Sequence, residues 1–135
     1  MSHFTPNEIK YLSSQPLGRL ATVNSQGDPH VVPVSFRFNA ELDTIDIGGF
    51  NLSKSKKFRE AVQHGRVAFV VDDVLPPWQP RGVEVRGLAR AETLQETMQE
   101  GMDAEILRIT STHITSWGID SDAYHPSSRS VHSNS

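Results

Sequence analysis

A glycine pair followed by basic residues is the part of this sequence best suited to bind an anion. Gly48 and Gly49 end a short apolar run, and residues 50–59 then carry two serines, three lysines and an arginine. Free backbone N–H groups and the helix dipole attract phosphate to a helix start. Basic side chains there cost about 0.3–1 kcal/mol each unless an anion offsets them. We interpret the segment as a phosphate site, with a solvated basic helix face as the alternative.

A second candidate is the proline-rich segment at residues 75–87, which holds one indole. Trp78 lies between prolines and is followed by Arg81 and Gly82 at the start of an alternating strand pattern. A rigid loop of this kind can hold a flat apolar wall and a close-approaching backbone against an aromatic ligand. The alternative is that Trp78 closes one end of the fold, and the sequence is equally compatible with both.

No residue pattern in the chain predicts a metal site or a catalytic side chain. His30, His64 and His113 lack metal-ligand spacing and are predicted to be surface or hydrogen-bonded histidines, and there is no cysteine. The chain also lacks the G-x-S-x-G, P-loop and G-x-G-x-x-G motifs. An enzyme of this kind would rely on a cofactor for its chemistry and would itself supply binding and orientation.

The elements that must position these segments follow from capping residues and alternation. Thr5, Pro6 and Glu8 predict a helix start with a capping box, and the helix should end near Ser14. We expect further helices at about residues 54–63 and 93–102, and strands at residues 19–23, 30–38, 44–47, 67–71 and 81–90, with one or two more within 105–117.

Three segments are expected to depart from regular structure. Pro33 within the second strand indicates an edge position or a bulge. Residues 72–80 are predicted to form an ordered but irregular loop. Residues 121–135 are rich in serine and have little to bury, so we expect an unstructured, dispensable tail. His125 or His132 could instead fold over the site as a lid.

Composition limits the class of protein. The chain has 135 residues, enough for one domain, and a net charge of −3, which disfavours a nucleic-acid or membrane-surface partner. Met1 to Lys10 carries no export signal, so a cytoplasmic location is expected. Only 36% of the residues are apolar, which suggests that a second subunit covers part of the surface. Short connections between antiparallel strands predict a mainly β fold, a small β-barrel with short helices.

Taken together and in order, several segments resemble the pyridoxamine 5′-phosphate oxidase-like family of flavin- and deazaflavin-binding proteins. The similarity lies in residues 17–23, 27–36 and 55–59. Residues 78–87 and 114–120 are also similar to its small actinobacterial branch, which uses coenzyme F-420. The resemblance implies a split β-barrel over residues 1–120 that forms a homodimer, with two cofactor clefts at the subunit interface.

The resemblance also implies which residues bind the cofactor. The backbone of Val32, Pro33, Val34 and Ser35 would contact the ring, and Phe50 and Asn51 would line the ribityl chain. Ser55, Lys56 and Lys57 match a Ser-Arg-Lys phosphate motif, with Lys56 replacing a bidentate arginine by a point charge. Trp78, Pro80, Arg81 and Gly82 would wall the cleft, from the same chain or from the partner.

The implied function is that of a homodimeric oxidoreductase. It would transfer hydride from reduced coenzyme F-420 to an electron-poor double bond of a small organic substrate. One alternative is an FMN-dependent oxidoreductase of the same fold, and another is a flavin- or deazaflavin-binding protein without enzymatic activity. A vitamin B6 oxidase is not expected, because the C-terminal substrate-binding segment of those enzymes has no counterpart here.

Overall fold

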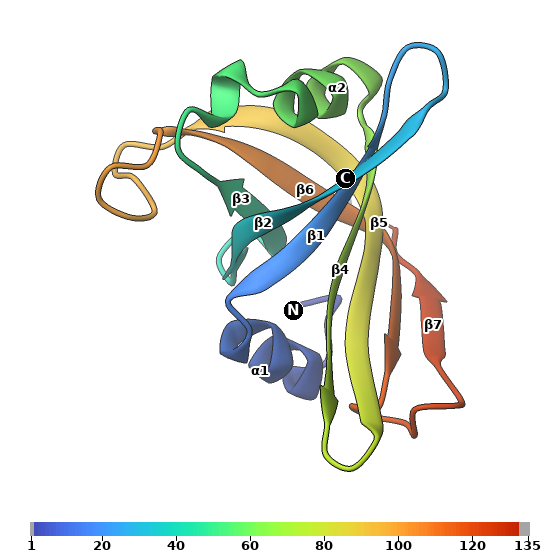
Figure 1. Ribbon diagram of the computed structural model, residues 1–135. Helices are drawn as coiled ribbons and strands as arrows, with labels where there is room; N and C mark the ends of the chain where they lie inside the picture. The colour runs from blue at the N-terminus through green and yellow to red at the C-terminus, as the bar shows by residue number, and fades with distance from the viewer. Residues whose placement is uncertain (1, 133–135) are drawn as a thin grey trace.

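The chain forms a closed antiparallel β-barrel with one helix near each end (Figure 1). The structure is a computed structural model and describes residues 2–132. Strand order in the sheet is β3-β2-β1-β4-β5-β6-β7, and pairing of β3 with β6 closes six of the strands into the barrel. The expected barrel class is confirmed. The seventh strand, β7, extends the sheet from β6 and lies outside the closed ring.

Ten elements make up this fold. The helical elements are α1 (Pro6–Ser14), the 3₁₀ turn η1 (Leu52–Lys54) and α2 (Lys56–His64). The strands are β1 (Leu17–Val23), β2 (Pro29–Asn39), β3 (Thr44–Gly48), β4 (Arg66–Leu75), β5 (Gln79–Thr93), β6 (Glu105–Trp117) and β7 (Ser127–Ser130).

The barrel interior is filled by alternate residues of its strands. Leu20, Phe69 and Ile114, from β1, β4 and β6, are fully or almost fully buried. The outward-facing residues between them are more exposed, as a half-buried antiparallel sheet requires. Apolar burial of this kind is the main stabilising contribution to the fold.

The predicted start of the first helix is confirmed in detail. The Thr5 hydroxyl accepts a hydrogen bond from the Glu8 backbone N–H, and the Glu8 carboxylate accepts one from the Thr5 N–H. Tyr11 and Leu12 are buried on the core side of α1. The capping box therefore fixes where α1 begins, and its apolar face seats it against the barrel.

The second helix begins slightly later than expected, and one of its buried residues is a glutamate. It starts at Lys56 after the short turn η1, and Gly65 ends it in the left-handed conformation (φ 81°). The buried residues of α2 are Phe58, Glu60 and Ala61, whereas Val62 is exposed. A polar network described below explains this burial of a carboxylate.

Two of the connections differ from the sequence expectation. Residues 72–80 do not form an irregular loop, because β4 and β5 stay paired as far as Leu75 and Gln79, which leaves a short hairpin turn. Residues 93–102 do not form a helix. The methionines of this loop pack onto Gly48, where an added Cβ would lie 2.8 Å from the Met98 sulfur. The packing of Met98 and Met102 onto β3 therefore holds this segment as a loop instead of a helix.

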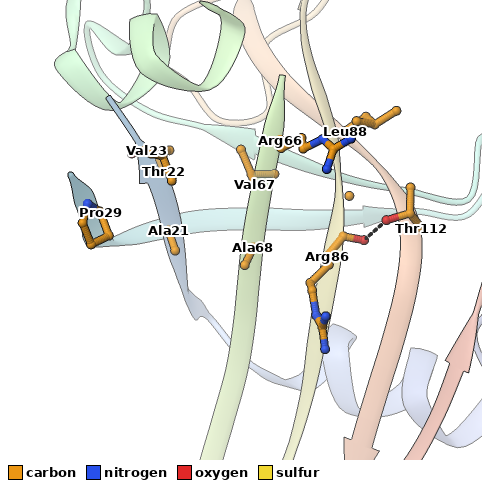
Figure 2. Close-up of a pocket in the computed structure, with 11 residues that line it drawn as sticks. Ala21, Thr22, Val23, Pro29, Arg66, Val67, Ala68, Arg86, Leu88 and Thr112 are labelled. Atoms are coloured by element: carbon orange, nitrogen blue, oxygen red, sulfur yellow. Dashed lines mark hydrogen bonds between the residues drawn. The ribbon is translucent and has the colours of Figure 1, made fainter. Parts of the chain in front are cut away.

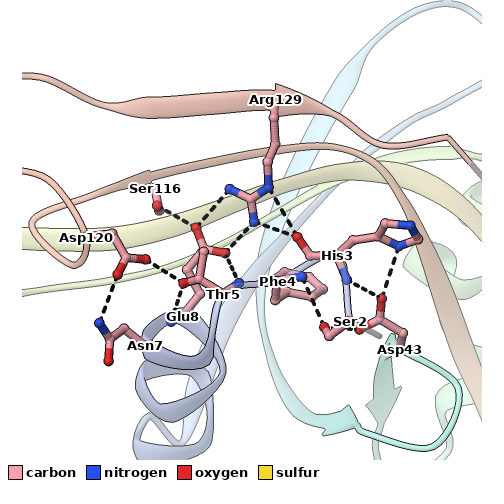
Figure 3. A network of polar contacts seen from close by, with 10 residues as sticks. All are labelled: Ser2, His3, Phe4, Thr5, Asn7, Glu8, Asp43, Ser116, Asp120 and Arg129. Carbon is pink, nitrogen blue, oxygen red and sulfur yellow. Dashed lines mark hydrogen bonds and ion pairs between the residues drawn. The ribbon is translucent and has the colours of Figure 1, made fainter.

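The serine-rich C-terminal segment also differs from the expectation of an unstructured tail. Ser127–Ser130 pair with His113–Ser116 as strand β7. Arg129 of this strand donates hydrogen bonds to the buried Glu8 carboxylate at 2.5 and 3.2 Å (Figure 3). Polar contacts rather than apolar burial therefore order the segment, which is why composition did not reveal it. The final part of the expected tail, residues 133–135, lies outside the described residues.

Candidate functional site

Half of strand β2 has a free edge on the outside of the barrel. Residues 29–35 pair with β1, whereas β3 pairs only with residues 35–39. Pro33, which has no N–H to donate, lies in this unpaired half, so the predicted edge position is confirmed. The backbone groups of residues 29–34 that face this side have no strand partner and are available to a ligand.

The polar segment from Gly49 to Arg59 runs beside this free edge. At one end Ser35 pairs with Gly48, and at the other end the His30 side chain contacts Glu60 of α2. The structure therefore brings together two of the three groups of residues expected to bind a cofactor. These are the ring-binding strand (Val32, Pro33, Val34, Ser35) and the phosphate segment (Ser55, Lys56, Lys57).

The start of α2 has the features of an anion site. Ser55 is the N-cap, and its hydroxyl accepts a hydrogen bond from the Phe58 N–H at 3.2 Å. No acidic residue lies in the first turn, and the Lys56 and Lys57 side chains come from that turn. The dipole, the backbone N–H groups and the lysines together favour a phosphate. The Lys56 side chain is 66% exposed, so a ligand can reach it.

A buried carboxylate ties this helix to β1 and β2. Glu60 accepts hydrogen bonds from Thr22 Oγ1 and from His30 Nδ1, both at 3.0 Å, and Lys56 Nζ lies 3.9 Å from it. The hydrogen bond from His30 is the main reason why the pKa of Glu60 lies below its usual value. His30 is thus hydrogen-bonded as predicted. The network was missed in the sequence, where only the Lys56 and Glu60 spacing indicated a pair.

The loop between β5 and β6 also supports the phosphate segment. The Asp103 carboxylate accepts hydrogen bonds from the backbone N–H groups of Asn51 (3.2 Å) and Ser53 (3.4 Å). Phe50 is 63% exposed and lies beside Gly101, where an added Cβ would be 3.1 Å from the Phe50 ring. Phe50 and Asn51 are therefore held against the β5–β6 loop. The role of Asp103 had no sequence signal, because it depends on a long-range contact.

The third expected group, Trp78, Pro80, Arg81 and Gly82, lies at the opposite end of the barrel. Strand β4 separates the end of α2 from the β4–β5 hairpin. Its ten residues span roughly 30 Å, at about 3.3 Å for each residue. Within one chain these residues cannot meet the start of α2. The Trp78 side chain is 66% exposed, so it does not close the barrel end as the alternative required.

Arg81 is fixed in position beside this hairpin. Its guanidinium donates two hydrogen bonds to the Asp73 carboxylate, at 2.7 and 3.0 Å, and lies over the Tyr11 ring. Burial first, and then the hydrogen bond to Asp73, raises the pKa of the Tyr11 hydroxyl above its usual value. Gly82 lies under Trp117, where an added Cβ would be 2.4 Å from the indole.

A cavity of about 550 Å³ lies on the outer face of β1, β4 and β5 (Figure 2). Its floor is largely apolar, with Ala21, Ala68 and Leu88, and it is flanked by Arg66 and Arg86. None of the residues expected to bind a cofactor lines it. The cavity is thus a feature of the outer sheet face, separate from the phosphate segment.

Comparison with known proteins places this geometry in a family. Residues 5–131 match the family model described as pyridoxamine 5′-phosphate oxidase. The chain belongs to this family. The expected resemblance is therefore confirmed, and so is membership of the oxidoreductases.

A relative from Streptomyces rimosus is a 5a,11a-dehydrotetracycline/5a,11a-dehydrooxytetracycline reductase. It is 44% identical to this chain over 122 residues, which cover 88% of this chain and 86% of the relative. An FAD-binding protein from Mycobacterium smegmatis has a similar structure, with a TM-score of 0.64, 25% identity and coverage of 84% of this chain and 92% of that one. General stress protein 26 of Bacillus anthracis shares the fold (TM-score 0.66, 18% identity, 92% and 96% covered).

Two further features of the described residues concern other kinds of site. Among residues 2–132, no helix has the length and apolar character that a membrane crossing needs. The same part of the chain contains no cluster of three or more histidine, aspartate or glutamate side chains that could hold a metal ion.

Proposed function

We propose that this protein is a reductase that uses reduced coenzyme F-420 as its hydride donor. The observation that carries the proposal is the 44% identity, over 88% of the chain, to a reductase. The free edge of β2 beside the basic start of α2 supports it, because a flat ring with a phosphorylated side chain needs both features. The structure of this chain is also similar to that of an FAD-binding protein, which favours a cofactor with a flavin-type ring.

The residues of this chain would bind and orient the cofactor. The backbone of Val32, Pro33, Val34 and Ser35 would hydrogen-bond to the edge of the ring. Ser55, Lys56 and Lys57 would hold the phosphate. The Glu60 carboxylate would orient Lys56 and His30 through its contacts with both side chains. Phe50 and Asn51 would flank the chain that joins ring and phosphate. The bound deazaflavin supplies the hydride, and closure of the cleft excludes water.

A second copy of the chain would complete each cleft. In one chain, Trp78, Pro80, Arg81 and Gly82 lie toward the end of β4 that is remote from α2, so a second copy would have to bring them to the cofactor. The outer sheet face has the apolar character of an interface, since Val31 and Leu88 are 67% and 52% exposed beside the cavity there. A two-fold dimer would cover this face and join the two groups.

The substrate class follows from the relative. That enzyme acts on dehydrotetracyclines, which suggests a planar polycyclic acceptor with an electron-poor double bond for this chain. The product would gain the hydride at one carbon of that bond and a proton at the other. No side chain of the described site is assigned as the proton donor.

FMN is the alternative cofactor, and Lys56 is the residue that distinguishes the two. A lysine in place of the bidentate arginine weakens the grip on the compact phosphate of FMN. We therefore expect coenzyme F-420 to bind at least about tenfold more tightly than FMN, which corresponds to about 1.4 kcal/mol.

Side-by-side titration tests this proposal. Purified protein would be titrated with oxidised F-420 and with FMN, and oxidation of reduced F-420 would then be followed with a dehydrotetracycline acceptor. Tighter FMN binding together with FMN-dependent turnover would support the alternative cofactor. Cofactor binding without turnover of any acceptor would instead support a binding protein without enzymatic activity.

A further inference from the structure

A groove of about 340 Å³ lies between the β4–β5 hairpin and the connection from β6 to β7. One wall contains Leu75, Trp78 and Arg81, and the other contains Asp122 and Tyr124. The two walls come from segments about forty residues apart in the sequence. Nothing in the sequence pattern indicated that they meet.

Two aromatic side chains line this groove and remain open to solvent. Trp78 is 66% exposed and Tyr124 is 71% exposed. Exposed aromatic groups gathered around one hollow are characteristic of a binding site, since each offers a flat apolar face that water solvates poorly.

Both walls are held in place by the fold. Pairing of β4 with β5 continues to the hairpin turn, and β6 pairs with β5 as far as Gly82 and Trp117. Gly118 (φ 68°) packs so closely that an added Cβ would be 2.3 Å from the Pro80 carbonyl oxygen. The Asp122 carboxylate accepts a hydrogen bond from the Tyr124 N–H at 2.8 Å. The backbone that carries the two aromatic side chains is therefore held in place, which lowers the entropic cost of binding.

The charge of the groove indicates what kind of ligand it accepts. Arg81 is neutralised by its two hydrogen bonds to Asp73. Asp122 is an exposed carboxylate, with His125 Nδ1 at 2.8 Å. Because Arg81 is paired with Asp73, the described residues that line the groove offer no unpaired arginine or lysine to a phosphate, whereas the Asp122 carboxylate can accept hydrogen bonds from hydroxyl or ammonium donors. The groove is therefore unsuited to the phosphate of the cofactor and suited to an uncharged or cationic aromatic ligand.

We propose that this groove binds the acceptor substrate, a planar polycyclic molecule that carries hydroxyl or amino donors. Trp78 and Tyr124 would stack on its rings, and Asp122 would face its donor groups. The inference rests on the proposed reductase function and on the dimer, which would place this end of one chain next to the cofactor of the other. Tyr124 is then a specificity-determining residue.

Calorimetric titration tests the groove independently of turnover. Tetracycline, which has four fused rings and a dimethylamino group, would be titrated into protein loaded with oxidised F-420. We expect Tyr124→Ala to weaken binding about fivefold, or about 1 kcal/mol, and Tyr124→Phe to keep it within about twofold. Leu42→Ala, an exposed apolar residue in the β2–β3 turn, is the matched control and should bind like the unmodified protein.

The outcomes separate this inference from the proposed function. Unchanged tetracycline binding by a folded Tyr124→Ala variant, or no binding by the unmodified protein, would overturn the groove as the substrate site. Binding that depends on Tyr124 without reduction of any polycyclic acceptor would support the groove and contradict the reductase. Melting curves followed by circular dichroism check that Tyr124→Ala is folded. If it is not, the tetracycline affinity of Tyr124→Phe is compared with that of the unmodified protein instead.

Discussion

At the scale of single residues, the start of α2 carries basic side chains that oppose the helix dipole. Lys56 and Lys57 lie in the first turn, where a positive charge is unfavourable without an anion. Glu60 compensates Lys56 only from 3.9 Å. We therefore expect a bound phosphate to relieve this cost.

Replacing Lys57 with alanine should therefore weaken cofactor binding more than loss of an ordinary surface charge does. We expect a loss of more than about 1 kcal/mol in the binding free energy of F-420, because a charge-assisted contact is removed. Fluorescence titration at moderate salt measures it. Lys10→Ala, an exposed lysine on α1, is the control and should leave the affinity unchanged. Equal affinity of the Lys57 variant and the unmodified protein would contradict the phosphate site.

Glu8 shows how a buried charge can be stable at neutral pH. Burial alone would raise its pKa, but hydrogen bonds from Arg129 and Ser116 outweigh this effect and hold the pKa below the ordinary value of 4.5 (Figure 3). A carboxyl group with a lowered pKa stabilises the fold above its unfolded-state pKa. That contribution is lost as the pH falls through the folded-state pKa.

Arg129→Ala should consequently destabilise the protein and reduce its acid sensitivity. Loss of one partner of a buried ion pair costs about 3 kcal/mol near neutral pH. Urea unfolding between about pH 7 and pH 3 measures both effects. The difference between the variant and the unmodified protein should shrink toward acid, since protonated Glu8 no longer needs the arginine. A difference that stays constant with pH would contradict this account.

At the scale of elements, β7 is held mainly by polar contacts. Its four residues are three serines and Arg129, so the strand adds no large apolar side chain of its own. Val131, just after the strand, is buried and donates its N–H to the Thr112 carbonyl at 2.8 Å. The segment therefore extends the sheet and also contacts α1, through the hydrogen bonds from Arg129 to Glu8.

Removal of residues 121–135 should lower stability rather than leave it unchanged. The truncated chain would keep Glu8 buried without Arg129, at a cost of about 3 kcal/mol. Thermal melting followed by circular dichroism measures the loss. Adding Glu8→Gln to the truncated chain should recover part of it, because the unpaired charge is then removed. An unchanged melting temperature after truncation would mean that β7 contributes nothing.

At the scale of the whole molecule, the two groups of residues expected to bind the cofactor lie at opposite ends of β4, which leads us to expect a dimer. The protein should sediment at about twice its 15.0 kDa mass at micromolar concentration. Val31→Asp, on the outer face of β2, should convert the dimer to a monomer and should therefore also weaken F-420 binding. Leu42→Asp, in the β2–β3 turn, should do neither. A monomer that binds F-420 with full affinity would contradict the shared cleft.

Local chemistry was readable from the sequence wherever neighbouring residues determine the structure. The capping box at Thr5 and Glu8 and the edge position of Pro33 were predicted correctly, because each depends on a few neighbouring residues. The barrel class followed from alternation and short connections. The family resemblance added the candidate cofactor residues, since it depends on ordered motifs rather than on contacts.

Tertiary structure alone decided the features that depend on distant residues. Glu60 is buried because Thr22 and His30 hydrogen-bond to it, and a helical pattern that counts apolar residues cannot predict that burial. Asp103 reaches the phosphate segment across about fifty residues of chain. The serine-rich segment is ordered because Arg129 finds a buried carboxylate on α1. In each case a polar group is stabilised by a partner that only the closed barrel brings near, so the energy that orders it is absent from the local sequence.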